Sequence, residues 1–177
     1  MRQEEERAVA LLRKYGISEP PVPVAEIATK EGATIVRSRF DGTESGFALR
    51  DGRQIIIGIN NRTGRKRQRF SIAHELGHVI LHPLIPLIVD HALRVDWRDD
   101  VSSLGTDAQE IEANAFGAAL LMPQSMVIDQ IQRYVASSYD SNTGISSGEL
   151  ITQLARRFDV SSEAMGFRLI NLGILAG

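Results

Sequence analysis

Five consecutive residues have the types and spacing of a catalytic metal site: His74-Glu75-Leu76-Gly77-His78. If this segment is helical, His74 and His78 lie one turn apart on the same face and can bind one Zn²⁺ together. Glu75 then lies at the flank of the pair, where its carboxylate can take a proton from a zinc-activated water whose pKa falls toward about 7. The H-E-x-x-H spacing therefore predicts a zinc ion used in catalysis.

The residues around this motif predict the helix that the chemistry needs. Apolar and small residues at helical spacing form a face beside the two histidines: Phe70, Ala73, Gly77, Ile80 and Leu81. Pro83 has no backbone N–H and ends the helix. Gly77 costs the helix about 1 kcal/mol relative to Ala, which indicates that another element packs closely there. The alternative is an amphipathic helix whose two histidines are hydrogen-bonded and bind no metal.

A zinc site of this kind needs a third protein ligand. His82 continues the four-residue spacing, but two turns of helix separate it from His74 by about 12 Å. Two nitrogens bound to one zinc can be only about 4 Å apart. We therefore expect His82 at the helix end or beside a ligand, and not on the metal.

The third ligand is predicted on a second helix, which is rich in Ala and Leu and ends before Pro123. Glu110 and Asn114 share one face of this helix with small residues, so it can approach the first helix closely. From there Glu110 can reach the metal, and Asn114 can accept the free ring N–H of a metal-bound histidine. Glu112 points about 160° away around the helix. We prefer Glu110, and Glu112 remains the alternative.

Two longer segments carry a resemblance to a known family: R-x-R-F-S-I-A-H-E-L-G-H-V-I-L-H and E-x-E-A-N-A-F-G-A-A-L-L-M-P. In combination they resemble the ImmA/IrrE family of metallopeptidases. The similarity continues at 20–28, 45–47 and 154–161 and so covers nearly the whole chain. It implies a gluzincin-like zinc site of His74, His78 and Glu110, with Glu75 catalytic. Family patterns often have Ala at the position of Gly117, which affects no ligand.

The same resemblance implies a class of partner. Members of the family regulate DNA-binding repressors encoded beside them, and the expected activity is a zinc endopeptidase that cleaves a repressor or antitoxin. One alternative is a module that sequesters the repressor without cleaving it. Glu75 counts against this alternative, because a structural zinc site needs no general base and is usually closed by a fourth ligand. The other alternative is a DNA-binding regulator.

The rest of the chain predicts an α+β fold with a small antiparallel three-stranded sheet packed on helices. Helices are expected over 3–15 and 24–31, each ended by a glycine. Three strand-like runs then follow: 33–40, 45–50 and 54–60. Asp41-Gly42 and Asp51-Gly52 are turn signals between these runs.

An edge strand of this sheet has a use in the expected reaction. A free edge can pair with an extended peptide and hold it across the metal by main-chain hydrogen bonds. We expect this edge, and with it substrate binding, at Ser45, Gly46 and Phe47. The residue that stabilises the oxyanion is not identified by the sequence, and Tyr134 and His91 are weak candidates.

Residues 138–177 are expected to form a C-terminal helical element packed on a metallopeptidase-like domain of residues 1–137. Ser146 and Ser161 are predicted to cap two helices joined by a tight turn, with the spacing of a helix-turn-helix. Basic and acidic residues cancel here: Arg156, Arg157 and Arg168 against Glu149, Asp159 and Glu163. Phosphate contacts need an excess of positive charge, so we interpret this element as a packing or partner-recognition unit.

Composition fits one compact unit, with 177 residues of which 43% are hydrophobic. The net charge of −2 does not favour nucleic-acid binding, and the absence of cysteine excludes disulfides and thiolate ligands. The N-terminus is too polar for a signal peptide, and the apolar run at 84–89 is too short to span a membrane, so a cytoplasmic protein is expected. The basic run 62–69 is interpreted as a solvated helix start, in which Arg67 or Arg69 can steer an acidic partner.

Overall fold

A computed structural model of the chain describes residues 2–40, 45–83, 87–90, 106–138 and 146–176. Its elements are, in chain order, α1 (Gln3–Lys14), α2 (Val24–Lys30), β1 (Ala33–Ser38), β2 (Gly46–Asp51), β3 (Gln54–Asn60), α3 (Arg65–Leu81), β4 (Leu87–Asp90), α4 (Thr106–Leu121), α5 (Gln124–Ser138), α6 (Ser147–Phe158) and α7 (Ser162–Asn171). The expected α+β class is confirmed. Among these helices none has both the length and the apolar composition needed to cross a membrane.

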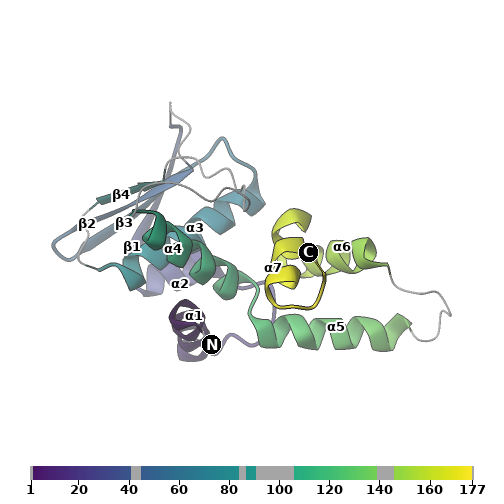
Figure 1. The fold of residues 1–177 in the computed structure, drawn as a ribbon. Helices are drawn as coiled ribbons and strands as arrows, with labels where there is room; N and C mark the ends of the chain where they lie inside the picture. The colour runs from purple at the N-terminus through teal and green to yellow at the C-terminus, as the bar shows by residue number, and fades with distance from the viewer. Residues whose placement is uncertain (1, 41–44, 84–86, 91–105, 139–145, 177) are drawn as a thin grey trace.

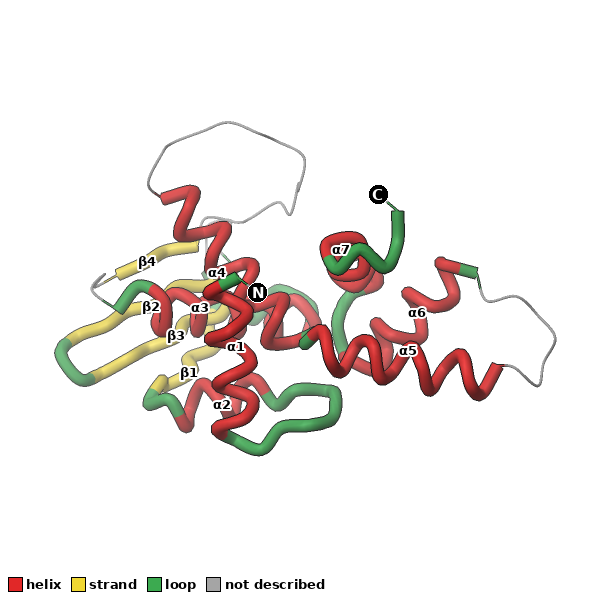
Figure 2. The backbone as a smooth tube through the Cα atoms, turned by 60° about the horizontal axis from the view of Figure 1, so that its bottom comes forward, coloured by secondary structure: helices red, strands yellow, loops and turns green. Residues whose placement is uncertain are grey.

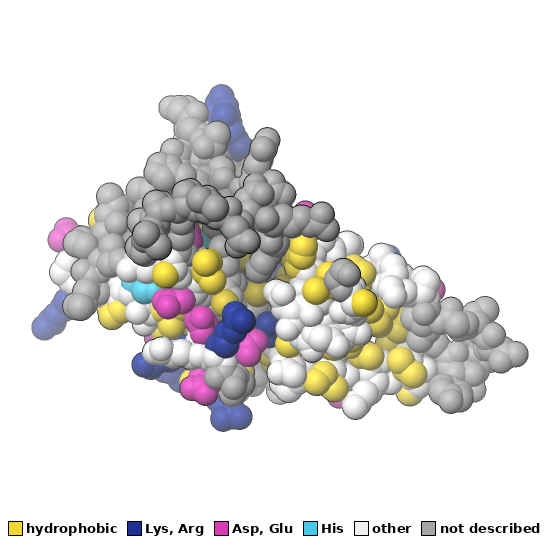
Figure 3. Space-filling view, in the orientation of Figure 1, with side chains coloured by type: hydrophobic (Ala, Val, Ile, Leu, Met, Phe, Trp, Pro, Cys, Tyr) yellow, Lys and Arg dark blue, Asp and Glu magenta, His cyan; other side chains and the backbone are white. Residues whose placement is uncertain are grey.

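The elements form two groups in space (Figure 1). The sheet and helices α1 to α4 make up one group, and α5, α6 and α7 make up the other. One continuous cluster of buried apolar side chains includes residues of both groups, from Ala8 in α1 to Leu169 in α7. Hydrophobic side chains are also spread over the face of the α5–α7 group that Figure 3 shows. Exposed large hydrophobic residues of these helices include Ile128, Val135 and Ile170.

The sheet is mixed, which corrects the expected antiparallel three-stranded arrangement. The strand order is β1-β3-β2-β4. β2 and β3 form the predicted hairpin, in which Asp51 is paired with Gln54 and Gly52 has the positive φ of 56° that the turn requires. β3 also pairs with β1, in parallel. A turn signal reports only a local reversal of the chain, so it could not show that β3 enters between β1 and β2. The Asp41-Gly42 signal lies outside the described residues.

The fourth strand changes which strand lies at the edge. β4 comes from the apolar run after α3 and pairs antiparallel with β2, so that Gly46 lies opposite Asp90. β2 therefore has a neighbour on each side, and the predicted edge at Ser45, Gly46 and Phe47 is wrong. Among the described strands, β1 and β4 are the edges. The run that forms β4 was too short and too uniformly apolar for its period to identify a strand.

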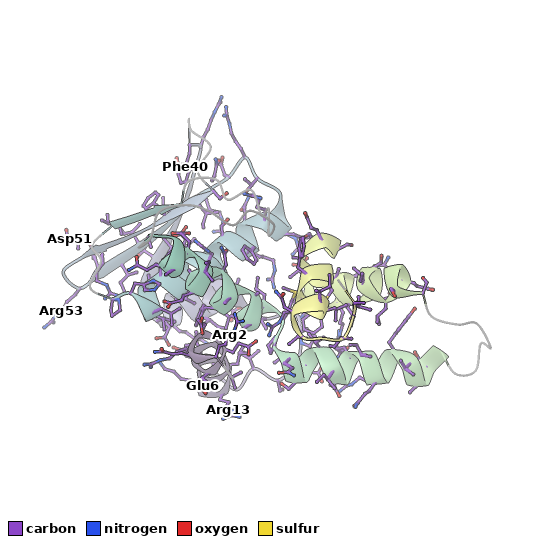
Figure 4. The ribbon with its side chains drawn as sticks, in the orientation of Figure 1. Arg2, Glu6, Arg13, Phe40, Asp51 and Arg53 are labelled. Carbon is purple, nitrogen blue, oxygen red and sulfur yellow. The ribbon has the colours of Figure 1, made fainter. Side chains whose placement is uncertain are left out.

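Helices α3 and α4 are the centre of the fold, where they lie side by side next to the sheet (Figure 2). α3 packs on β2 and β3 and brings Ile72 and Leu76 into the core. α1 covers α4 from the other side. The buried residues of α1, such as Leu11, belong to this core, while Arg2 and Arg13 extend outward (Figure 4).

Two glycines allow α3 and α4 to approach closely. A Cβ at Gly77 would lie 3.1 Å from both the Ala113 carbonyl oxygen and the Phe116 ring. A Cβ at Gly117 would lie 3.3 Å from the His74 backbone nitrogen. Both contacts are tighter than those of ordinary side chains. The close packing expected at these positions is confirmed, and it brings the polar face of α4 next to the histidines of α3.

The predicted helix caps of the C-terminal element are confirmed. Ser146 Oγ accepts from the Glu149 N–H at 3.2 Å, and Ser161 Oγ accepts from the Ala164 N–H at 3.1 Å. The turn between α6 and α7 contains Asp159 in the left-handed conformation, with φ of 55°. Helix α5 was not predicted. It begins directly after Pro123, which ends α4 and precedes the first turn of α5.

Two arginines in the first turns of α3 connect this helix to the turn between α6 and α7. Arg65 forms an ion pair with Asp159 at 2.6 Å, and Arg69 forms a second one at 3.2 Å. Arg69 also donates to the Val22 carbonyl oxygen at 2.9 Å. Burial lowers the pKa of Arg69 from its ordinary value, and the Asp159 carboxylate opposes this effect. Arg69 thus stabilises the fold. Of the two arginines expected to steer an acidic partner, Arg67 is the remaining candidate.

Candidate metal centre

Three side chains from α3 and α4 meet at one point. His74 Nε2 and His78 Nε2 lie 3.0 Å apart, and each lies 3.2 Å from a carboxylate oxygen of Glu110. Donor atoms bound to one tetrahedral zinc, each about 2.0–2.1 Å from it, are about 3.3 Å from one another. The two histidines are almost fully buried and Glu110 is partly buried. The arrangement therefore has the size and ligand types of a His₂Glu zinc site.

The state of Glu110 is a test of whether these residues fit a cation. Its Oε2 is buried and accepts no hydrogen bond from the described residues, although His74 Nε2 lies 3.2 Å away. Burial raises the pKa of Glu110, but His74 and His78 outweigh burial and lower it to about 2. Glu110 is therefore an anion at neutral pH. A bound divalent cation would satisfy its buried oxygen, so the residues fit the metal.

The protonation of His78 agrees with this role. Burial lowers its pKa, the Glu110 carboxylate opposes this effect, and His74 adds to it. The net direction favours the neutral imidazole, which is the form that binds a metal. Glu110 is thus an anion next to the neutral imidazole of His78.

The outer nitrogens of both histidines also have partners. His74 Nδ1 lies 3.0 Å from Asn114 Oδ1, the contact expected of Asn114. His78 Nδ1 lies 3.2 Å from His82 Nδ1, and His82 Nε2 lies 2.9 Å from Glu112 Oε2. If His78 binds a metal through Nε2, its Nδ1–H donates to His82, and the Nε2–H of His82 donates to Glu112. His82 and Glu112 thus lie behind the ligands, each in a role distinct from that of Glu110.

We expect that His82→Ala weakens zinc binding by about 10–100-fold, because loss of an outer partner frees the ring of His78. His82→Gln should retain more of the affinity, since its amide oxygen can accept the same proton. Competition against a chelator of known zinc affinity measures both variants. Equal affinities for wild type and His82→Ala would show that this contact does not orient His78.

Glu75 lies at the meeting point of α3 and the sheet. It is fully buried, and a Cβ at Gly46 would lie 2.8 Å from Glu75 Oε1. The glycine at this position of β2 thus lets the strand backbone reach the carboxylate. Next to it, Ser45 Oγ accepts a hydrogen bond from Arg67 at 2.9 Å. Ser45 and Gly46 are therefore close to the motif, although not as an edge.

The remaining candidate residues do not join the cluster. The ring of Phe47 packs over Gly58, where it leaves no room for a side chain, and its centroid lies 5.7 Å from that of Phe40. Phe47 thus stabilises the sheet. Tyr134 is on α5, away from the three converging residues, and is absent from the residues that line the neighbouring cavity. His91 lies outside the described residues.

A cavity of about 220 Å³ lies beside His74, between α3 and α7. Its lining comes from three regions: Ser45, Lys66, Arg67, Phe70, Ser71 and His74; Ala118 and Met122; and Val160, Ser161, Glu163, Ala164, Phe167, Arg168 and Asn171. The contribution of α7 was missed at the sequence level. The apolar Phe167, at a position where a DNA-binding helix would have a base-reading residue, was the available signal.

Comparison with known proteins shows the family of the chain. The chain matches the peptidase M78 family, described as IrrE N-terminal-like domain, over residues 28–170. It is 29% identical over 117 residues to uncharacterized immunity region protein 2 of Bacillus phage phi105, which is 66% of each protein. It is 32% identical over 116 residues to the radiation response metalloprotease IrrE of Deinococcus deserti, and 30% identical over 116 residues to that of Deinococcus radiodurans. These matches include 64% of this chain but only 35% and 30% of the two metalloproteases.

A solved structure shares the fold. It is described as a Mycobacterium tuberculosis transcriptional regulator, and it superposes with a TM-score of 0.65 at 19% sequence identity. The match covers 96% of this chain and 46% of that one. The family match over most of the sequence identifies the chain as a member of the family of IrrE N-terminal-like domains.

Proposed function

We propose that this chain is a zinc-dependent endopeptidase that cleaves one specific protein partner, a DNA-binding repressor or antitoxin encoded nearby. The observation that carries the proposal is the convergence of His74, His78 and Glu110 at 3.0–3.2 Å, next to the buried Glu75. In the proposed site these three residues hold the metal, and Asn114 and His82 orient the two imidazoles. Glu75 is the general base.

The proposed reaction is hydrolysis of a peptide bond. When bound, the metal ion supplies Lewis acidity that activates a water molecule and polarises the scissile carbonyl. Glu75 takes the proton of the attacking water and delivers it to the leaving amine nitrogen as the C–N bond breaks. Burial of Glu75 between α3 and β2 limits the positions that its carboxylate can take, and so keeps the proton acceptor in place.

The names of two relatives support the choice of partner. One is an immunity region protein of a phage, and the other is a radiation response metalloprotease. Both names point to control of a genetic response. Cleavage of the regulator that represses such a response would release it at once and irreversibly.

The second alternative, a DNA-binding regulator, has little support in the C-terminal helices. One side of α7, with Glu163 and Phe167, lines the cavity beside α3. Arg168 is buried and forms an ion pair with Glu5 at 2.9 Å, and Arg157 donates to Gln130 and Glu19. Two of the three arginines of this element are therefore engaged within the chain, which reduces the positive charge available for phosphates.

The decisive experiment combines the zinc-loaded protein with the purified repressor encoded next to its gene. We expect cleavage at one site, detected by mass spectrometry, which stops when a chelator removes the metal and returns when zinc is restored. A repressor that is bound tightly but stays intact in the presence of zinc would contradict the peptidase and favour sequestration. An intact repressor that is not bound at all would contradict both.

A further inference from the structure

The cavity between α3 and α7 adjoins the metal centre through one shared residue. His74, which is 1% exposed, belongs to both. Ser45 also lines the cavity, and its neighbour Gly46 lies against Glu75. A peptide held across His74 and Glu75 would therefore have one of its side chains directed along α3 toward α7.

The chemistry of the lining defines what this side chain would be. The interior is mainly apolar, with Phe70 on α3, Met122 after α4, and Ala164 and Phe167 on α7. An apolar cavity of about 150 Å³ is enough to take a benzene ring, and this one measures about 220 Å³. The space thus suits an aromatic or long aliphatic side chain.

The α7 side of the cavity is held firmly in place. Arg168 is 7% exposed, donates to the Met122 carbonyl oxygen at 3.0 Å and pairs with Glu5. Asp159, in the turn before α7, is bonded by Arg65 and Arg69 from α3. Asp159 thus ties the start of α7 to α3, and Arg168 ties the far part of α7 to α1 and to the end of α4, so the cavity is part of the fold.

We propose that this cavity is a specificity subsite that takes a bulky apolar side chain of the substrate next to the scissile bond. The C-terminal helices then form one side of the substrate-binding cleft. This inference rests on the proposed function, because it names which substrates the same centre accepts. Lys66 and Arg67 are exposed and line the same cavity, so they favour acidic residues of the substrate near this side chain.

The test measures binding separately from cleavage. The zinc-loaded Glu75→Gln protein is titrated with acetyl-Ala-Ala-X-Ala-Ala-amide peptides, in which X is Phe, Leu, Ser or Asp, and followed by ¹H–¹⁵N NMR. With X as Phe or Leu, shifts are expected at the amides of Phe70, Ala118, Ala164 and Phe167. Binding should be at least tenfold weaker with Ser or Asp, because these side chains bury less apolar surface in the cavity. Equal affinity for all four peptides, or shifts elsewhere, would overturn the proposal.

A pair of variants on α7 locates the effect. Ala164→Phe fills the cavity and should reduce the preference for Phe over Ser to less than twofold. Ile170→Phe is the matched control, because Ile170 is 39% exposed on the same helix and does not line the cavity. It should keep the full preference. If Ala164→Phe no longer binds zinc or no longer gives the dispersed spectrum of a folded protein, Phe167→Ala is tested in its place. A preference for Phe over Ser that is unchanged in Phe167→Ala would contradict the subsite.

Failure of this inference and failure of the peptidase would look different. Cleavage of the repressor together with no preference for apolar peptides leaves the peptidase intact and removes the subsite. A clear preference for the Phe peptide together with an intact repressor leaves a binding site without the proposed activity.

Discussion

Cleavage of the repressor is expected to fall by about 10²–10⁴-fold in the Glu75→Gln protein, while the metal content stays at that of the wild type. Gln has the shape of Glu and fits the same buried position against Gly46. It cannot accept the proton of the attacking water, so only the chemical step is lost. Cleavage rate by quantitative mass spectrometry, with zinc content by atomic absorption, measures the two effects separately.

The control for this prediction is Glu26→Gln, an exposed carboxylate on α2 that is remote from the centre in sequence and has no role in the proposed reaction. It should cleave at the wild-type rate. In a reporter strain, Glu75→Gln should leave the repressor active. If Glu75→Gln relieves repression as well as the wild type does, the chain acts without peptide hydrolysis, and the sequestering alternative replaces the peptidase.

The local elements were predictable because their signals are local. The caps at Ser146 and Ser161, the hairpin at Gly52 and the end of α3 before Pro83 each depend on residues within one turn. The same holds for the two histidines, since a spacing of four places them on one face of any helix. Glu110 could also be predicted, because small residues share its face of the helix and allow that face to approach α3.

What could not be predicted depends on contacts between distant segments. The pairing of β3 with β1 and of β4 with β2 depends on how the strands pack on α3. The sequence of a single strand does not show which other strand it pairs with. The cavity is of the same kind, because its sides come from segments that the Arg69–Asp159 and Arg168–Glu5 pairs bring together. Glu112 and His82 were each considered as ligands, yet their contact with one another was visible only in three dimensions.

Zinc binding is expected to discriminate sharply between the two glutamates of α4. Glu110→Ala removes the carboxylate from the three converging residues and leaves only the two imidazoles as ligands. Removing a residue that only hydrogen-bonds a ligand lowers zinc affinity by about 10–100-fold. The loss in Glu110→Ala should be larger, and the purified variant should contain almost no zinc. Glu112→Ala should retain one zinc per chain, because Glu112 contacts His82 and does not reach the cluster.

This comparison has a built-in control, since both changes remove one carboxylate from the same helix and alter its net charge equally. Thermal unfolding of the two variants should respond differently to added zinc, with a rise in Tm for Glu112→Ala and little for Glu110→Ala. The reverse pattern would mean that Glu112 is the third ligand and that α4 turns by almost half a revolution when the metal binds. Loss of zinc in both variants would instead show that the Glu112–His82–His78 chain is as necessary for holding the metal as Glu110 itself.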